Sequence, residues 1–330
     1  MARPSLDVGG SSLSGEARAR VRAFVTPAVD AGGEGAAPAR WDLVLGESLA
    51  LLTHLPSGCV QTVAGDGPYS SGGAFRGDRA QGTGTKYTTT ETAKEDRLQD
   101  RFVDFEGDTR DQLSFTHWAA LWMAECYRVA ERGAIGAFWT DWRQIGATIN
   151  AFQAGGWVYR GIFVWDKTEG ARPRKGGCRQ QGEFVVWGTK GPLDESRVDH
   201  CAPGVVKVAS TTATKRGHQC GKPDDAQRPW VRLTPPGGIL LDPFAGGAGL
   251  CDVVLDEGEG RRYLGFEVVP RIHAEAHARL SARTGENRVA VEAGGGVPLA
   301  GDGQGHGRRR KGTNGAGAGG KQLLLGEAPK

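Results

Sequence analysis

One segment, residues 239–249, constrains this chain more than any other. Its residues, Ile-Leu-Leu-Asp-Pro-Phe-Ala-Gly-Gly-Ala-Gly, predict a buried strand, a glycine-rich turn and the start of a helix. Such a turn presents backbone N–H groups and a helix N-terminus to a ligand that carries negative charge or lone pairs. Glu267 ends the next apolar run, where an acid can accept hydrogen bonds from ribose hydroxyls. The C-terminal third therefore predicts half of a nucleoside-cofactor site.

A second short motif lies far upstream, where Asp66-Gly67-Pro68-Tyr69 follows the apolar run 59–64. Doubly wound folds bind ligands at the carboxyl ends of their strands. An Asp and an adjacent carbonyl there could accept both hydrogens of an exocyclic amine, while the aromatic ring stacks on the base that carries it. Asp-Gly and Pro are also common turn formers, so the tetrapeptide by itself favours a plain β-turn.

Glycine is unevenly spread along the 330 residues, and its distribution divides the chain. Residues 1–39 lack a periodic apolar face, and residues 294–321 are nearly all Gly around a basic cluster at 308–311. Neither stretch can bury enough apolar surface to offset the entropy lost on ordering. We therefore expect disordered segments at 1–39 and 291–330, and one folded domain at 40–290 that can hold a sizeable core.

Charge and cysteine usage set weaker limits. A formal net charge of +3 is compatible with nucleic acid as a partner but does not require it. The six cysteines show neither CxxC nor paired His spacing, which predicts free thiols in a reducing cytosol and no metal site. The N-terminus lacks the apolar core of a signal peptide and no run approaches membrane-spanning length, so a cytoplasmic location without membrane contact is expected.

Apolar runs alternate with helical spacing through the expected domain. Strands are predicted to begin near residues 41, 59, 134, 158, 183, 239 and 263. Helices are predicted at 48–52 with Ser48 as the cap, at 115–130, from 141 to about 154, from 250, and from 270 to about 283. This alternation indicates an α/β fold with a mainly parallel, doubly wound sheet of about seven strands. Residues 70–112 form a long polar loop, and 189–230 are expected to be irregular.

Three motifs in this order resemble those of the DNA methyltransferases that make N6-methyladenine or N4-methylcytosine. Asp66-Gly67-Pro68-Tyr69 is similar to the family's catalytic Asp-Pro-Pro-Tyr. Residues 242–249 are similar to its cofactor motif Asp-Pro-Phe-Xaa-Gly-Xaa-Gly, with Gly-Ala in place of the usual Ser-Gly. Residues 218–223 keep the first and the last two positions of His-Pro-Thr-Gln-Lys-Pro. The order resembles the permuted group, whose catalytic half comes first, and residues 142–188 resemble phage-like members.

The resemblance implies a seven-stranded Rossmann-like methyltransferase fold with circularly permuted motif order and S-adenosylmethionine as the cofactor. The catalytic half would span 40–190, a short recognition or connecting segment 189–217, and the cofactor half 218–284. The strand at Trp41 would be the third of the sheet, and those at Ile239 and Tyr263 the first and second.

The same resemblance implies roles for residues. Asp66 and the carbonyl of Gly67 would accept from the exocyclic amine of a base flipped out of double-stranded DNA, Tyr69 would stack on that base, and Pro68 would hold the turn. Cofactor contacts are expected from Lys222, Pro223, Asp242, Phe244, Gly246 and Glu267. DNA contacts are expected from the basic residues of two loops, Arg76, Arg79, Lys86, Arg172, Arg174, Lys175 and Arg179. A leading Asp rather than Ser favours adenine N6 over cytosine N4, and both stay open.

Gly67 departs from the family motif, which has Pro at this position. Because the mechanism uses the backbone carbonyl of that residue, Gly67 can still supply it, with a loss of rigidity on the order of 1 kcal/mol. On this reasoning Gly67→Pro would keep or raise turnover. A non-catalytic DNA-binding module with the same fold, and a methyltransferase for RNA or a protein amide, are the alternatives. The expected setting is an orphan or phage-borne enzyme in a bacterial cell, either monomeric or homodimeric.

Overall fold

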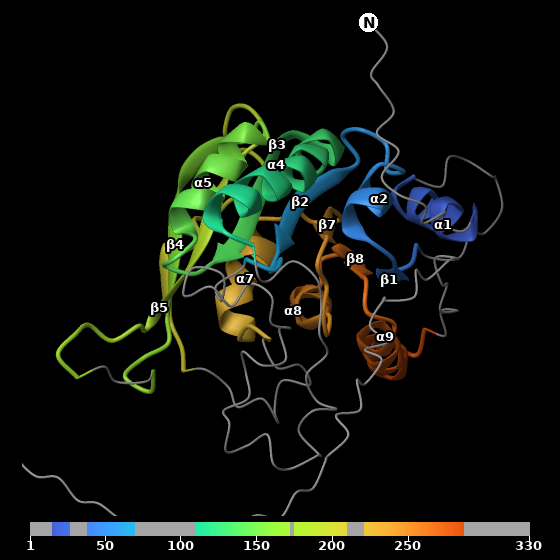
Figure 1. Ribbon diagram of the computed structural model, residues 1–330. Helices are drawn as coiled ribbons and strands as arrows, with labels where there is room; N and C mark the ends of the chain where they lie inside the picture. The colour runs from blue at the N-terminus through green and yellow to red at the C-terminus, as the bar shows by residue number, and fades with distance from the viewer. Residues whose placement is uncertain (1–14, 27–37, 70–109, 172–174, 210–220, 287–330) are drawn as a thin grey trace, which may run out of the picture. The chain divides into compact units, whose positions relative to one another are not determined.

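The structure is a computed structural model that describes residues 15–26, 38–69, 110–171, 175–209 and 221–286 (Figure 1). All of these residues belong to one structural unit, Met1–Gly296. The tail at 291–330 and residues 70–109 of the polar loop lie outside the described ranges, and so do the predictions made for them.

The described ranges contain an eight-stranded mixed sheet. Its strands are β1 (Trp41–Leu45), β2 (Val60–Gly65), β3 (Ala130–Thr140), β4 (Val158–Asp166), β5 (Gly182–Thr189), β6 (Val205–Lys207), β7 (Ile239–Asp242) and β8 (Arg262–Glu267). Across the sheet the order is β1-β8-β7-β2-β3-β5-β4-β6. β5 runs antiparallel to its neighbours β3 and β4, and the other described pairs are parallel. The predicted doubly wound, mainly parallel sheet is confirmed, with β6 as a strand beyond the seven predicted.

The strand order also confirms the circular permutation. β7 pairs with β2 on one side and with β8 on the other, and β1 pairs with the far side of β8. The register between β1 and β8 runs from Trp41 opposite Tyr263 to Leu45 opposite Glu267. The first and second strands of the cofactor half therefore come from the C-terminal part of the chain, and the third comes from its N-terminal part.

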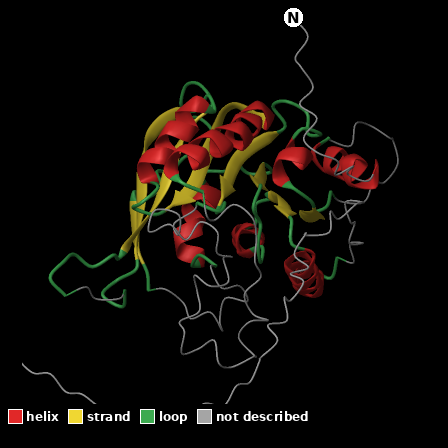
Figure 2. Cartoon of the chain, viewed as in Figure 1, coloured by secondary structure: helices red, strands yellow, loops and turns green. Residues whose placement is uncertain are grey.

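Helices cover both faces of the sheet (Figure 2). α2 (Ser48–Leu52), α4 (Gln112–Val129) and α5 (Ile145–Ala154) pack on one face, and α7 (Asp224–Arg232), α8 (Gly249–Glu257) and α9 (Pro270–Thr284) pack on the other. Successive side chains of a strand point to opposite faces. On β7, Leu241 accordingly packs with the first group of helices and Leu240 with the second.

The N-terminal segment contains a helix, so the prediction that all of residues 1–39 are disordered is wrong. α1 (Gly15–Val25) buries four side chains at helical spacing, Ala17, Val21, Phe24 and Val25. Arg20 on the same helix makes a bidentate ion pair with the carboxylate of Asp42 in β1, at 2.8 Å from Nε to Oδ2. The average composition of 1–39 concealed this short apolar face, and Asp42 is fully buried because a cation from α1 meets it.

Residues 189–230 are more regular than predicted, since they contain β6 and most of α7. Ala226, Trp230 and Val231 of α7 are buried, but charged residues and a proline between them hide this apolar pattern in the sequence. The cap of α2 also differs from the prediction. Glu47 accepts the capping hydrogen bond from the backbone N–H of Ala50, at 2.7 Å.

Candidate active site

The predicted motifs meet at one edge of the sheet. Asp66 directly follows β2, Asp242 ends β7 and Glu267 ends β8, and these three strands are parallel neighbours. The carboxyl ends of parallel strands form the edge at which doubly wound folds place their ligands. The fold therefore brings together the catalytic and cofactor motifs, which lie more than half of the chain apart in sequence.

Lys222 lies against the catalytic motif. Its Nζ atom is 2.7 Å from Oδ2 of Asp66 and 2.8 Å from Oε1 of Glu183. The Lys222 side chain is 6% exposed, compared with 26% for Asp66. Its backbone is fixed by the start of α7, where Pro223 is the N-cap and Gln227 Nε2 donates to the Lys222 carbonyl at 3.1 Å. The motif resemblance assigned Lys222 to the cofactor, whereas in the structure its ammonium group contacts the carboxylate of Asp66.

Glu183 is a member of this site that no sequence motif singled out. It is the second residue of β5, and its side chain is 9% exposed. Oε1 of Glu183 accepts a hydrogen bond from the hydroxyl of Tyr69 at 3.0 Å, and Oε2 is 2.8 Å from Nζ of Lys167, which directly follows β4. Glu183 is the one charged residue of β5, whose central residues 184–187 are all apolar. That exception is the sequence signal that could have identified it.

Four side chains form a chain of alternating charge, in the order Asp66, Lys222, Glu183 and Lys167. The two inner members, Lys222 and Glu183, are buried, and the two outer ones are partly exposed. Burial raises the pKa of Glu183, but the ammonium groups of Lys222 and Lys167 outweigh it and bring this pKa down to about 2. Burial also lowers the pKa of Lys222, but the carboxylates of Asp66 and Glu183 raise it above its ordinary range. Glu183 is therefore ionised and Lys222 is protonated at neutral pH.

Gly67 contacts the cofactor motif. A Cβ atom at position 67 would lie 3.0 Å from both Cδ2 and Cε2 of Phe244, closer than ordinary van der Waals contact. The Phe244 ring is itself enclosed by tryptophans of α4, with centroid distances of 4.9 Å to Trp122 and 6.0 Å to Trp118. The motif comparison predicted only a loss of rigidity at Gly67, but the missing side chain also makes room for Phe244.

Asp242 is buried, and both of its carboxylate oxygens accept hydrogen bonds from the protein itself. Its Oδ1 accepts from the backbone N–H of Phe244 at 3.1 Å, and its Oδ2 accepts from the hydroxyl of Tyr263 at 3.1 Å. Burial raises the pKa of Asp242 to about 7, against the lowering effect of these two hydrogen bonds. The side chain holds the glycine turn in shape, so its effect on a ligand would be indirect.

Hydrogen bonds join the glycine turn to the end of β8 and to α9. Oε2 of Glu267 accepts from the backbone N–H of Gly246 at 2.8 Å, and Oε1 accepts from that of Val269 at 2.7 Å. Burial raises the pKa of Glu267 above its ordinary value, against these backbone hydrogen bonds. Arg279 of α9 donates to the carbonyl of Gly247 at 2.8 Å. Together these contacts fix the turn that precedes α8.

The turn enters α8 through a left-handed residue, Ala248, which has φ 54° and is the N-cap of the helix. The family motif has Gly at this position, and an Ala there costs on the order of 1 kcal/mol of backbone strain. The alanine also offers no side-chain acceptor for the first N–H groups of α8. These N–H groups and the helix dipole are the features of the turn that would favour a ligand with lone pairs or negative charge.

The predicted DNA contacts are only partly described. Lys175 and Arg179 belong to the connection between β4 and β5, which extends beyond the sheet in Figure 1. Both are exposed, and Arg179 donates to the carbonyls of Glu169 and Ala171, so it also braces its own loop. The other five predicted DNA contacts, at positions 76, 79, 86, 172 and 174, lie outside the described residues, as does His218. Because β4 ends and β5 begins beside Lys167 and Glu183, this connection projects from the edge that carries the site.

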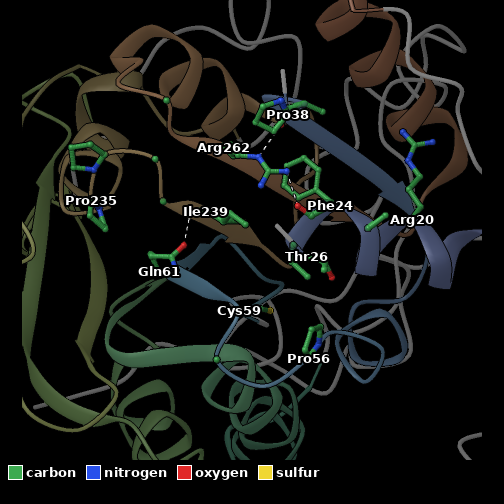
Figure 3. Close-up of a pocket in the computed structure, with 18 residues that line it drawn as sticks. Arg20, Phe24, Thr26, Pro38, Pro56, Cys59, Gln61, Pro235, Ile239 and Arg262 are labelled. Atoms are coloured by element: carbon green, nitrogen blue, oxygen red, sulfur yellow. Dashed lines mark hydrogen bonds between the residues drawn. The ribbon is translucent and has the colours of Figure 1, made fainter. Parts of the chain in front are cut away.

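A cavity of about 1240 Å³ lies at the opposite edge of the sheet (Figure 3). Its walls come from the amino ends of β2, β7 and β8, represented by Gln61, Ile239 and Arg262, and from the C-terminal half of α1. Gln61 Oε1 accepts from the backbone N–H of Ile239 at 2.7 Å across this wall. The cavity shares no residue with the catalytic or cofactor motifs, so it is separate from the candidate active site.

Three further features concern possible metal sites, the cysteines and membrane-spanning helices. Among the described residues, no group of three or more His, Cys, Asp or Glu side chains could hold a metal ion. The five cysteines in these ranges are free thiols. Of the helices that the structure describes, none is long and apolar enough to span a membrane.

The fold has solved counterparts. It matches "Putative DNA Modification Methylase" TTHA0409 from Thermus thermophilus, complexed with S-adenosyl-L-methionine, with a TM-score of 0.52 at 16% identity, over 77% of this chain and 98% of that one. It also matches the PvuII DNA methyltransferase (cytosine-N4-specific) with a TM-score of 0.52 at 15% identity, over 76% of this chain and 89% of that one. The fold is therefore that of the S-adenosylmethionine-dependent DNA methyltransferases.

Sequence relatives agree with the fold. "Putative methylase YubD" from Escherichia coli (strain K12) is 26% identical over 182 residues, which cover 55% of this chain and 77% of the relative. The model of the N6/N4 DNA methylase family, which uses S-adenosylmethionine, matches residues 60–278, a range that includes Asp66, Lys222, Asp242 and Glu267. With both motifs at one sheet edge and the permuted strand order of the fold, this chain belongs to the N6/N4 DNA methylase family.

Proposed function

We propose that this protein transfers a methyl group from S-adenosylmethionine to the exocyclic N6 amine of an adenine that has been flipped out of double-stranded DNA. The observation that carries the proposal is the placement of Asp66 and Tyr69 at the carboxyl end of β2, next to the glycine turn after β7. A target base must leave the duplex to reach such an edge.

Asp66 and the carbonyl of Gly67 accept hydrogen bonds from the amine and thereby direct its lone pair. Lys222 lies 2.7 Å from Oδ2 of Asp66, so this oxygen is already held in an ion pair. The role of Asp66 is therefore orientation rather than removal of a proton before attack. The ring of Tyr69 stacks on the base, and Pro68 limits the freedom of the turn. Catalysis rests on positioning and on fixed charges.

The glycine turn provides the cofactor site. When bound there, S-adenosylmethionine supplies an activated methyl group. The residues fit such a ligand, because Glu267 ends the neighbouring strand and the first N–H groups of α8 have no side-chain cap. Asp242 and Phe244 act by shaping the turn, and Gly246 allows its close approach to Glu267. Lys222 and Pro223 are assigned to the methionine end of the cofactor, as the motif resemblance implies.

The preference for adenine rests on the first letter of the catalytic motif, which is Asp in this chain. The family covers both N6-adenine and N4-cytosine enzymes, and the PvuII enzyme with the same fold is cytosine-N4-specific. N4-cytosine methylation is therefore the second candidate. It uses the same residues, since both reactions place an exocyclic amine between a carboxylate and a carbonyl.

The connection between β4 and β5 is proposed to contact DNA phosphates through Lys175 and Arg179, together with predicted contacts outside the described residues. Such contacts position the duplex without reading its sequence. The placement of this connection at the active edge supports the proposal. The protein would act in the cytoplasm of a bacterial or phage-infected cell, where DNA is available to it.

Sequencing of methylated bases in DNA from a host that expresses the protein tests this function. We expect methylated adenine at one short recurrent sequence, and none in DNA from a host that expresses Asp66→Ala at the same level. DNA without any methylated base, together with normal binding of the protein to duplex DNA, would instead support a non-catalytic DNA-binding member of the fold.

A further inference from the structure

Glu183 joins three elements of the site. It belongs to an inner strand, because β5 pairs with both β3 and β4, and Glu183 itself is opposite Trp165 of β4. Its carboxylate meets Tyr69 from the segment after β2, Lys222 from the start of α7 and Lys167 from the end of β4. An inner strand of the sheet therefore carries the acceptor, and segments next to three other elements carry the donors.

The two carboxylate oxygens of Glu183 have different partners. Oε2 is bound by Lys167 at 2.8 Å, which fixes the plane of the carboxylate from the strand side. Oε1 faces the catalytic motif and accepts from both Tyr69 and Lys222, at 3.0 Å and 2.8 Å. Because Glu183 stays ionised, the hydrogen bond from the Tyr69 hydroxyl is charge-assisted, and such bonds are about twice as strong as neutral ones.

The bond to Tyr69 decides how its ring is presented. Pro68 limits the backbone next to Tyr69, but the tyrosine side chain can still rotate about two torsions. The hydrogen bond from the Tyr69 hydroxyl to Glu183 selects one of these orientations and so determines which face of the ring a base can stack on. The position of Lys222 depends on the same oxygen, since its ammonium group lies between Glu183 and Asp66 and 5.5 Å from the centroid of the Tyr69 ring.

We propose that Glu183 is a positioning residue for methyl transfer, whose carboxylate fixes the ring of Tyr69 and, through Lys222, the carboxylate of Asp66. This inference rests on the proposed function, because it assigns Glu183 to the same reaction. It goes beyond that function by placing the control of base stacking and of the catalytic carboxylate in one residue of β5, a strand that carries neither motif.

Three variants and one matched control test the proposal. Glu183→Gln keeps the shape of the side chain and removes its charge. Tyr69→Phe keeps the ring and removes the hydroxyl, and the third variant combines the two changes. The control is Glu257→Gln at the end of α8, because the Glu257 side chain is also largely buried, at 13% exposed, and also binds two cations, Arg228 and Arg232, but lies away from the site.

The assay uses a duplex oligonucleotide that contains the sequence found methylated in the expressing host. Single-turnover rates are measured together with the dissociation constant of S-adenosylmethionine by calorimetry and with the melting temperature. Tyr69→Phe and Glu183→Gln should each slow transfer about 10- to 100-fold, as expected for loss of a hydrogen bond to a charged group. Their cofactor affinity should stay within about threefold, because neither variant changes a residue that is assigned to the cofactor. Glu257→Gln should react at the wild-type rate.

The double variant separates positioning from general weakening. Both single changes act on the same bond, because Tyr69→Phe removes its donor and Glu183→Gln removes the charge that strengthens it. Their effects should therefore be less than multiplicative in the double variant. Single effects that multiply in the double variant would overturn the proposal, and so would a folded Glu183→Gln protein with the wild-type rate. If Glu183→Gln does not fold, the Tyr69→Phe variant tests the proposal. A wild-type rate of methyl transfer by Tyr69→Phe rejects the proposal, and a slower rate with unchanged cofactor affinity supports it. A wild-type protein that methylates no DNA would remove the proposed function and this inference together.

Discussion

A side chain at position 67 should destabilise the site, in contrast to the expectation from the motif alone. The Cβ atom of Ala or Pro would lie 3.0 Å from two carbons of the Phe244 ring, so the ring must move by a few tenths of an ångström. Trp122 and Trp118 enclose that ring, and a well-packed aromatic group accommodates an added methyl poorly. The backbone itself is permissive, because Gly67 is not among the described residues with positive φ.

The magnitude follows from two opposing effects. Overpacking by one methyl group costs about 1–3 kcal/mol. Replacing Gly by Ala recovers about 0.4–1 kcal/mol by reducing the freedom of the unfolded chain. Gly67→Ala should therefore lose about 1–2 kcal/mol, which lowers the melting temperature by about 2–4 °C per kcal/mol in a domain of this size. Gly67→Pro should lose at least as much, and both variants should methylate DNA more slowly because Phe244 belongs to the cofactor turn.

Calorimetric melting of wild type, Gly67→Ala, Phe244→Leu and the double variant checks this reasoning. Phe244→Leu removes the crowded ring edge, so the loss in the double variant should be smaller than the sum of the single losses by about 1 kcal/mol. Methylation of duplex DNA is measured on the same four proteins. A Gly67→Ala protein with wild-type melting and wild-type turnover would refute the reasoning, and additive losses would show that Phe244 does not carry the effect.

Other predictions test the separate parts of the site. Asp66→Ala should abolish methyl transfer with nearly unchanged S-adenosylmethionine affinity, whereas Asp242→Ala should weaken that affinity by distorting the turn; calorimetry measures both, and normal turnover of Asp66→Ala would reject its assignment. Burial raises the pKa of Asp242 from its ordinary value of 3.8 to about 7, so the folded state retains a proton that the unfolded state has lost. Stability should therefore fall as pH rises from about 4 to about 7, and Asp242→Asn should flatten this fall in melting experiments; an unchanged pH profile would contradict the cause. Replacing Lys175 and Arg179 by Ala should reduce the slope of log affinity for DNA against log salt by up to about 2, and deletion of residues 294–330 by up to about 3–4. Neither change should alter the methylated sequence, and an altered sequence would place base readout in these segments.

The parts of the site that the sequence predicted are those built from consecutive residues. Strand, turn and helix at 239–249, and the tetrapeptide after β2, each carry their chemistry within a few positions, so the local pattern reveals them. Their meeting at one edge followed from the rule that parallel strands end together. Their permuted order was recognisable because the motifs keep their residue types when the chain is cut at a different place.

The contacts that the sequence did not reveal join residues that are far apart in the chain. Tyr69 and Glu183 are separated by 114 positions, and no local pattern connects them. Lys222 was placed with the cofactor because of its neighbours in sequence, whereas its ammonium group binds two distant acids, Asp66 after β2 and Glu183 in β5. The helix α1 was missed for a different reason, because the average composition of residues 1–39 conceals its short apolar face. Its ion pair to the buried Asp42, however, is another contact that the local pattern does not show. Long-range ion pairs of this kind are set by tertiary packing and have no periodic signature.

The central claim is the transfer of a methyl group to the N6 amine of adenine. Mass spectrometry of nucleosides measures this most directly, after purified protein has been incubated with unmethylated duplex DNA and S-adenosylmethionine carrying an isotopically labelled methyl group. We predict labelled N6-methyladenine with the wild-type protein and none with Asp66→Ala. Labelled N4-methylcytosine would contradict the assignment of the base, and the absence of any labelled nucleoside, from a folded protein that binds the cofactor and DNA, would contradict the assignment of the reaction.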